Sequence, residues 1–147
     1  MSKKGFTLIE LLIVIAILGF LSTIGLASFR SSQIKSRDAQ RKHDLGQIQR
    51  ALEAYYNDKG GYPLTADFPG GGGSWSDEHE TLYMKEIPKD PKFGNYAYYS
   101  ADGTSYRIYA RLENVKDAAI PDSGSYSGTS CGGEECNYGV SSANVAP

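Results

Sequence analysis

One carboxylate interrupts a long apolar run near the N-terminus. Between Phe6 and Phe29 the only charged residue is Glu10. A carboxylate at the centre of a membrane costs about 2.5–3.5 kcal/mol on insertion scales, so such residues usually pair, reach the interface or have a function. Glu10 is therefore either an interfacial glutamate or a carboxylate that pairs with a cation of a second molecule.

Two cysteines near the C-terminus offer a second kind of chemistry. Cys131 and Cys136 flank a four-residue segment of two glycines and two glutamates. A disulfide across this loop would constrain the unfolded chain by roughly 2 kcal/mol. The alternative is a zinc site, which needs four ligands, and neither His43 nor His79 is near the cysteines in the sequence. A disulfide is favoured if this segment lies outside the cytoplasm.

Catalytic motifs are not found, and we expect that the protein is not an enzyme. Gly70–Gly73 lacks the following Lys and Ser/Thr of a phosphate-binding loop. His43 and His79 have no recognisable nucleophile or metal partner in the sequence, and His43 is expected to be solvated.

The apolar run itself predicts a membrane-spanning helix. The 24 residues from Phe6 to Phe29 are long enough to cross a hydrocarbon core of about 30 Å at 1.5 Å per residue. A cleaved secretory signal fits poorly, because its apolar region has only about 7–15 residues. Lys3 and Lys4 precede the span and favour an orientation with the rest of the chain outside the cytoplasm.

Composition bounds the remainder of the chain. With 147 residues, 40% hydrophobic residues and a net charge of −2, it is expected to form one folding unit, and it is not a multi-span membrane protein, a disordered chain or a strongly basic nucleic-acid binder. Residues 30–59 carry a net charge of +3 and residues 60–147 carry −6. This division suggests complementary contacts between copies of the chain, or simply two solvated surfaces. Direct DNA contact through Arg37, Arg41 and Lys42 is a further alternative, although charged helix faces are commonly solvated or paired.

The helix is expected to continue beyond the membrane span. Apolar side chains recur at helical spacing from Leu45 to Tyr56, which predicts a buried stripe, and the helix is expected to end near Asn57 before Gly60 and Pro63. Leu64–Thr81, with its four glycines, predicts a flexible connecting loop.

Strand signals follow this loop. Asn95–Ser100 and Tyr106–Leu112 predict an antiparallel hairpin whose apolar face covers the helix stripe, while its tyrosines and arginines, Tyr109 among them, face water or a neighbour. A third short strand is expected near Tyr138–Val140. The predicted fold class is α+β: a long N-terminal helix packed against a small antiparallel sheet.

The stretch Lys4-Gly5-Phe6-Thr7-Leu8-Ile9-Glu10, followed by the apolar run, resembles the N-terminal signature of type IV pilins and pseudopilins. The resemblance implies that a prepilin peptidase cuts between Gly5 and Phe6 and methylates the new α-amine of Phe6. It also implies that Glu10 acts in filament assembly. The cut creates an α-ammonium that can pair with Glu10 of a neighbouring subunit, and a misregistered subunit would leave a charge unpaired at a cost of roughly 3–5 kcal/mol.

The head continues this resemblance more loosely, over roughly residues 1–115. The segments Ala51–Pro63 and Ile87–Pro91, with the tyrosine-rich hairpin, look like the heads of major pseudopilins of type II secretion and of related small pilins. The implied organisation is a leader at residues 1–5, a transmembrane and filament-core helix at 6–29, an amphipathic stem at 30–59 and a globular head at 60–147.

The same resemblance bears on metal binding, because the major pseudopilins bind calcium in a C-terminal loop. The weak candidates for calcium ligands are Asp117, Asp122, Glu134 and Glu135. The alternative is that these carboxylates are solvated loop residues. Many pilins also close a C-terminal loop with a disulfide, which agrees with the interpretation of Cys131 and Cys136.

The resemblance implies a structural subunit of a type IV pilus-like filament, assembled from the membrane. Its expected partners are copies of itself and other pilins, the prepilin peptidase, membrane lipid, an inner-membrane platform protein and an assembly ATPase. The main alternative is a major pseudopilin of type II secretion that drives protein export, and a less favoured one is a bitopic receptor or adhesin that never polymerises. Before assembly the protein is expected in the inner membrane with its head outside the cytoplasm, and afterwards in a surface pilus or a periplasmic pseudopilus.

Overall fold

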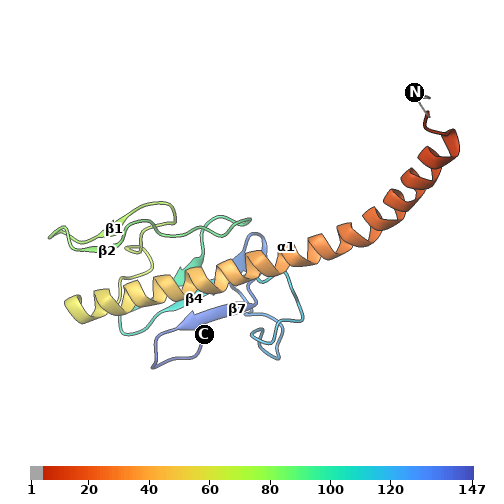
Figure 1. Ribbon diagram of the computed structural model, residues 1–147. Helices are drawn as coiled ribbons and strands as arrows, with labels where there is room; N and C mark the ends of the chain where they lie inside the picture. The colour runs from red at the N-terminus through yellow and green to blue at the C-terminus, as the bar shows by residue number, and fades with distance from the viewer. Residues whose placement is uncertain (1–4) are drawn as a thin grey trace. The chain divides into compact units, whose positions relative to one another are not determined.

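The computed structural model describes residues 5–147, apart from the side chains of residues 24, 25 and 27. It contains one helix, α1 (Leu8–Lys59), and short strands that follow it in the chain (Figure 1). The chain divides into two compact units, residues 1–36 and residues 37–147.

In the first unit, the described side chains of α1 are almost all exposed. An 18-residue window of the helix has a mean hydropathy of 2.5, which makes it long and apolar enough to cross a membrane. Burial of these side chains therefore requires lipid or other chains.

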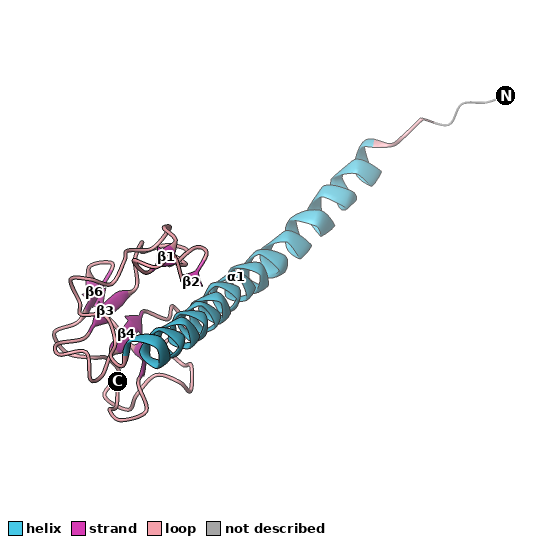
Figure 2. Cartoon of the chain, turned by 90° about the vertical axis from the view of Figure 1, so that its left-hand side faces the viewer, coloured by secondary structure: helices cyan, strands magenta, loops and turns pink. Residues whose placement is uncertain are grey.

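The second unit contains the remainder of α1 and a three-stranded antiparallel sheet. Its strands are β3 (Ala97–Tyr99), β4 (Arg107–Ala110) and β7 (Tyr138–Ser141), in the order β3-β4-β7. Figure 1 shows β4 and β7 alongside this part of α1, and in Figure 2 the labelled strands lie on one side of the helix. The predicted hairpin and the predicted third strand are both confirmed, and α1 ends at Lys59, two residues beyond the expected end.

The predicted stripe of α1 forms the core against this sheet, except that Tyr56 is 42% exposed. Leu45, Ile48 and Leu52 are at most 1% exposed, and they belong to the same buried cluster as Ile108 and Ala110 of β4. The α+β fold class is therefore confirmed.

The segment expected to be a flexible loop contains regular structure instead. β1 (Trp75–Ser76) pairs with β2 (Leu82–Met84) in an antiparallel hairpin. Next to it, the Gly72 N–H donates to the carbonyl of Ile87 at 2.7 Å, and the Ile87 N–H donates to the carbonyl of Gly73 at 2.8 Å. The reason is Trp75, whose buried ring stacks on Tyr55 of α1 at a centroid distance of 5.2 Å and anchors the segment to the core.

The outer face of the sheet also differs from the prediction. Tyr109 was expected to face water or a neighbour, but it is only 7% exposed and packs with Cys131 and Cys136. The C-terminal tail, which contains β5 (Ser130–Cys131) paired with β6 (Glu134–Glu135), covers this part of the sheet. The sheet is therefore buried on both faces at Tyr109.

Candidate filament-assembly site and its support

The start of α1 places the predicted assembly residue in a local hydrogen-bonded cap. Residues Gly5–Thr7 are not helical, and the helix begins at Leu8, so Thr7 is the N-cap and Glu10 is the third helical residue. The Thr7 N–H donates to Glu10 Oε2 at 2.9 Å, and the Glu10 N–H donates to Thr7 Oγ1 at 3.3 Å. This reciprocal pair is a capping box.

Thr7 was not among the predicted site residues. Its hydroxyl also donates to Glu10 Oε2, at 2.7 Å, so one oxygen of the carboxylate accepts two hydrogen bonds from a single residue. The signal was present in the sequence as Thr-x-x-Glu directly before an apolar run. Glu10 is thus oriented by its own chain before any second molecule approaches it.

The predicted cleavage site lies in the same exposed segment. Phe6 is 86% exposed, and a Cβ built on Gly5 meets no atom within 4 Å. A larger residue at position 5 would therefore meet no obstacle within the described chain. The preceding residues, including Lys3 and Lys4, lie outside the described residues.

Charge pairing between α1 and the head is centred on Arg41. Its side chain is fully buried, with Nε donating to Asp90 Oδ2 at 2.6 Å and Nη1 donating to Asp38 Oδ1 at 2.8 Å and Glu113 Oε1 at 2.9 Å. A buried guanidinium requires such partners, because an unpaired charge in the interior is strongly disfavoured. These contacts bind α1 to two segments of the head.

Arg37 extends this network toward solvent. It forms a two-pronged pair with Glu113, through Nε at 2.7 Å and Nη2 at 2.8 Å. Hydrogen bonds from Arg37 lower the pKa of Glu113 to about 2, helped by Arg41 and opposed by partial burial. Asp38 adds a third link, because its two carboxylate oxygens accept the backbone N–H groups of Glu113 and Asn114 at 2.9 and 2.8 Å.

This network corrects the interpretation of the basic stem. Neither solvation nor contact between copies accounts for Arg37, Arg41 and Lys42, because each pairs with a carboxylate of its own chain. The partner of Lys42 is Asp117, at 2.6 Å. These three side chains are therefore engaged within the subunit and are poorly placed to hold DNA phosphates.

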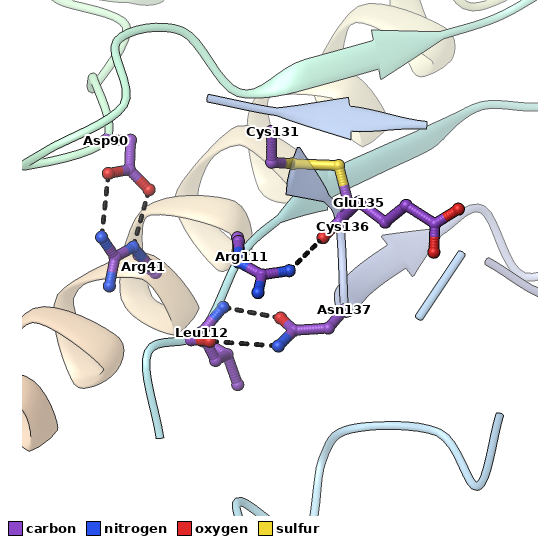
Figure 3. The surroundings of a disulfide bond; sticks show 8 residues. All are labelled: Arg41, Asp90, Arg111, Leu112, Cys131, Glu135, Cys136 and Asn137. Carbon is purple, nitrogen blue, oxygen red and sulfur yellow. Dashed lines mark hydrogen bonds and ion pairs between the residues drawn. A yellow bond between two sulfur atoms is a disulfide. The ribbon is translucent and has the colours of Figure 1, made fainter. Parts of the chain in front are cut away.

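The disulfide fixes the tail over the same region (Figure 3). Cys131 and Cys136 are bonded, and Cys136 is completely buried. The next residue, Asn137, accepts the Leu112 N–H at 2.6 Å and donates to the Leu112 carbonyl at 3.0 Å. The loop passes so close to Phe93 that a Cβ on Gly132 would overlap its ring, and Gly132 has φ +69°. Glycine is required there.

Comparison with known proteins agrees with these features. The family model of the prokaryotic N-terminal methylation motif matches residues 1–26. Type II secretion system core protein G of Pseudomonas aeruginosa is 32% identical over 109 residues, which cover 69% of this chain and 76% of that protein. The chain belongs to the type IV pilin and type II secretion pseudopilin family.

Two pilins of this family match over a smaller share of the chain. Fimbrial protein EcpC of Eikenella corrodens is 43% identical over 61 residues, covering 42% of this chain and 40% of that protein. Type IV major pilin protein PilA of Myxococcus xanthus is 37% identical over 60 residues, covering 41% of this chain and 27% of PilA. This chain therefore matches less than half the length of these two pilins. No solved structure gives a significant match.

The four calcium candidates of this pilin-family head lie in different surroundings. Asp117 pairs with Lys42, Glu134 pairs with Arg111, and Glu135 accepts a hydrogen bond from Ser125. Asp122 is exposed. Within residues 5–147 as described, no three acidic, histidine or cysteine side chains gather as a metal-binding group. His43 and His79 are both exposed, as expected for His43.

Proposed function

We propose that this chain is the structural subunit of a type IV pilus-like helical filament, with no catalytic role of its own. The observation that carries the proposal is the position of Glu10. It is the one charged residue between Phe6 and Phe29, and it lies in the first turn of α1, within the residues that the methylation-motif model matches. A carboxylate at this position can form an ion pair if a neighbouring subunit in the filament places a cation beside it.

The first step is cleavage between Gly5 and Phe6 by a prepilin peptidase, followed by methylation of the Phe6 α-amine. The exposed, non-helical backbone of Gly5 and Phe6 supports this step, because a protease binds its substrate in an extended form. Because the cut removes only residues 1–5, the apolar helix stays attached to the head.

The second step is pairing between Glu10 of one subunit and the Phe6 ammonium of its neighbour. Thr7 remains in the mature chain, so the capping box survives cleavage and leaves Glu10 Oε1 for the incoming cation. In a low-dielectric filament core, the pair offsets part of the desolvation of both charges, and an unpaired charge disfavours the wrong register.

These steps assign roles to the four segments of the chain. Residues 1–5 form the leader, residues 6–29 pack in the filament core after leaving the membrane, residues 30–59 form the stem, and residues 60–147 form the head. Before assembly the head lies outside the cytoplasm. A platform protein and an assembly ATPase supply the work of extraction, because the chain carries no recognisable nucleotide-binding motif.

A second candidate is the major pseudopilin of a type II secretion system. The match to core protein G supports it, because that match covers 69% of this chain and so extends beyond the N-terminal helix. The pseudopilin shares the cleavage and the Glu10 chemistry, and it differs in where the filament is found. A bitopic receptor that never polymerises is a third candidate, and it assigns no assembly role to Glu10.

The deciding experiment is intact-mass measurement and N-terminal sequencing of the protein, from membranes and from a sheared surface fraction of the same cells. A chain that begins at Phe6, is heavier by one methyl group and is abundant in the sheared fraction supports the pilus. Processed protein confined to the envelope supports the pseudopilus instead. A chain that retains Gly5 contradicts both filament proposals.

A further inference from the structure

The outer face of the sheet has an open half beside the half that the disulfide tail covers. In the pairing of β3 with β4, Ala97 lies opposite Tyr109 and Tyr99 lies opposite Arg107. These four side chains therefore lie on one face of the sheet. Ala97 and Tyr109 pack with the two cysteines. Tyr99, by contrast, is 52% exposed.

This open half is a cleft of about 450 Å³ between the sheet and the segment that leads into β5. Tyr99, Tyr109 and Arg107 line it on the sheet side, and Thr129 and Ser130 line it on the other. The volume is in the range of small-ligand sites, which combine aromatic surface with a few polar groups. None of the described residues that line the cleft is a carboxylate.

Arg107 differs from three other arginines of the second unit. Arg37, Arg41 and Arg111 each pair with a carboxylate. Within the described part of the chain no ion pair is found for Arg107, whose Nε donates to the carbonyl of Ala146 at 2.8 Å. That bond fixes the guanidinium and leaves its two terminal nitrogens for a carboxylate, the geometry that arginine binds best.

We propose that this cleft binds an acidic saccharide, with the sugar ring packed on Tyr99 and its carboxylate on Arg107. The negative face of a tyrosine ring attracts the C–H face of a sugar. The hydroxyls of Thr129 and Ser130 both donate and accept hydrogen bonds, as sugar hydroxyls require. The single cation among the described residues of the cleft, Arg107, matches the single carboxylate of such a saccharide.

A single-stranded nucleic acid fits the cleft less well, although its bases also stack on tyrosine. Such binding needs a positively charged groove that follows successive phosphates. The lining contributes one cation, and residues 60–147 carry a net charge of −6. These charges favour a ligand with a single negative charge over a polyanion.

The test is ligand-observed saturation-transfer NMR on the full chain in detergent micelles. The probes are methyl β-D-glucuronide, its neutral counterpart methyl β-D-glucoside, and oligothymidylate. We expect the glucuronide to bind with a Kd of about 1 mM and the glucoside to bind about tenfold more weakly, because one charge-assisted contact is lost. Equal binding of the two sugars, or no binding of the glucuronide, would overturn the proposal.

Variants locate the binding. Arg107→Gln is expected to remove the preference for the glucuronide, and Arg107→Lys to retain part of it. Tyr99→Leu is expected to weaken both sugars. Arg50→Gln changes an exposed arginine of α1 outside the cleft and is the matched control, so an equal loss in this variant would contradict the assignment.

Two further outcomes complete the test. Oligothymidylate binding that is lost in Arg107→Gln, with no glucuronide binding, would replace the saccharide by a nucleic acid and overturn the proposal. The proposal does not rest on filament formation. Arg107→Gln is expected to leave the amount of sheared filament unchanged, so failure of saccharide binding and failure of assembly are read separately.

Discussion

At the scale of single residues, the orientation of Glu10 is distinct from its proposed pairing with a second subunit. Thr7 holds one oxygen of the carboxylate by two hydrogen bonds, and this cap belongs to the isolated chain. In the proposed assembly, the charge itself is needed only when a second subunit brings a cation. A substitution that keeps the cap and removes the charge therefore distinguishes the two roles.

Glu10→Gln is that substitution, because glutamine also serves in a capping box. We expect normal membrane levels and normal processing, but loss of assembled filament, since the neutral side chain cannot pair with an ammonium. Quantifying subunit in membrane and sheared fractions checks this. Thr7→Ala is the matched variant: it weakens the cap by about 1 kcal/mol while keeping the charge, and filaments should persist. Normal filaments in Glu10→Gln would remove the pairing role.

Gly5→Leu tests the cleavage site independently. The described chain leaves open space around Gly5, so the substitution should not disturb the subunit itself, and any effect arises where the peptidase holds the backbone closely. We expect uncleaved precursor to accumulate, detected by intact mass. Gly5→Ala, which adds only a methyl group, should be processed to a greater extent. Complete processing of Gly5→Leu would contradict the assigned site.

Arg41 is the residue on which the head network depends most. Arg41→Met keeps the length of the side chain but leaves Asp38, Asp90 and Glu113 without their shared cation. Removing one partner of a buried pair costs roughly 3–5 kcal/mol. Denaturant unfolding of the full chain in micelles measures the loss, with Arg50→Met, at an exposed position, expected to change stability by less than about 0.5 kcal/mol.

At the scale of elements, the regular parts of the head could be predicted and the irregular parts could not. The helical spacing of apolar residues from Leu45 onward predicted the buried stripe. The alternation of side chains in Tyr106–Leu112 predicted β4. The ordering of the Gly70–Gly73 region depends on contacts of Trp75 with residues far away in sequence, such as Tyr55. A glycine run reports local freedom and carries no information about such contacts.

The tail is the clearest case of this limit. Its cysteines predicted a disulfide, but nothing local indicated that the loop would cover Tyr109. We expect the double variant Cys131→Ser, Cys136→Ser to lose about 2 kcal/mol of stability and to expose the Tyr109 ring. Tyrosine fluorescence quenching by acrylamide, measured together with thermal unfolding, checks both effects. Unchanged quenching would show that the tail stays in place without the bond.

At the scale of the whole molecule, the sequence showed the uneven charge but not its use. The +3 and −6 segments suggested contacts between copies, whereas Arg37, Arg41 and Lys42 pair within the chain. The net charges of the two segments cannot distinguish contacts between copies from pairing within one chain, because both arrangements have the same net charges. The methylation motif, in contrast, could be found from the sequence because Gly5, Phe6 and Glu10 lie in one short contiguous segment. The assembly roles of these residues stay predictions.

The internal pairing predicts how stability depends on pH. The pKa of Glu113 falls from 4.5 to about 2 in the folded chain, owing first to its hydrogen bonds from Arg37. A carboxyl with a lowered folded pKa stabilises the fold above its unfolded pKa, and this contribution is lost as pH falls from 4.5 toward 2. Asp44 acts in the opposite direction, because burial raises its pKa.

Urea unfolding at a series of pH values measures this dependence. We expect the free energy of unfolding to fall over that acidic window, and Glu113→Gln to flatten the fall while lowering stability at neutral pH. Glu86→Gln, at an exposed carboxylate, is the matched control and should follow the parent chain. Other carboxyls with lowered pKa values, such as Asp77 beside Lys59, contribute to the same fall. A Glu113→Gln profile parallel to the parent's would show that Glu113 does not contribute to it.

The contact between Asn137 and Leu112 has one more consequence, for the exchange of amide hydrogens with solvent. The Asn137 side chain bonds to both backbone groups of Leu112, as a neighbouring strand would, although Leu112 lies two residues beyond the end of β4. Both residues are at most 3% exposed. The Leu112 amide should therefore exchange as slowly as those within β4, opening only with the sheet as a whole. An irregular segment would then report the global stability of the head.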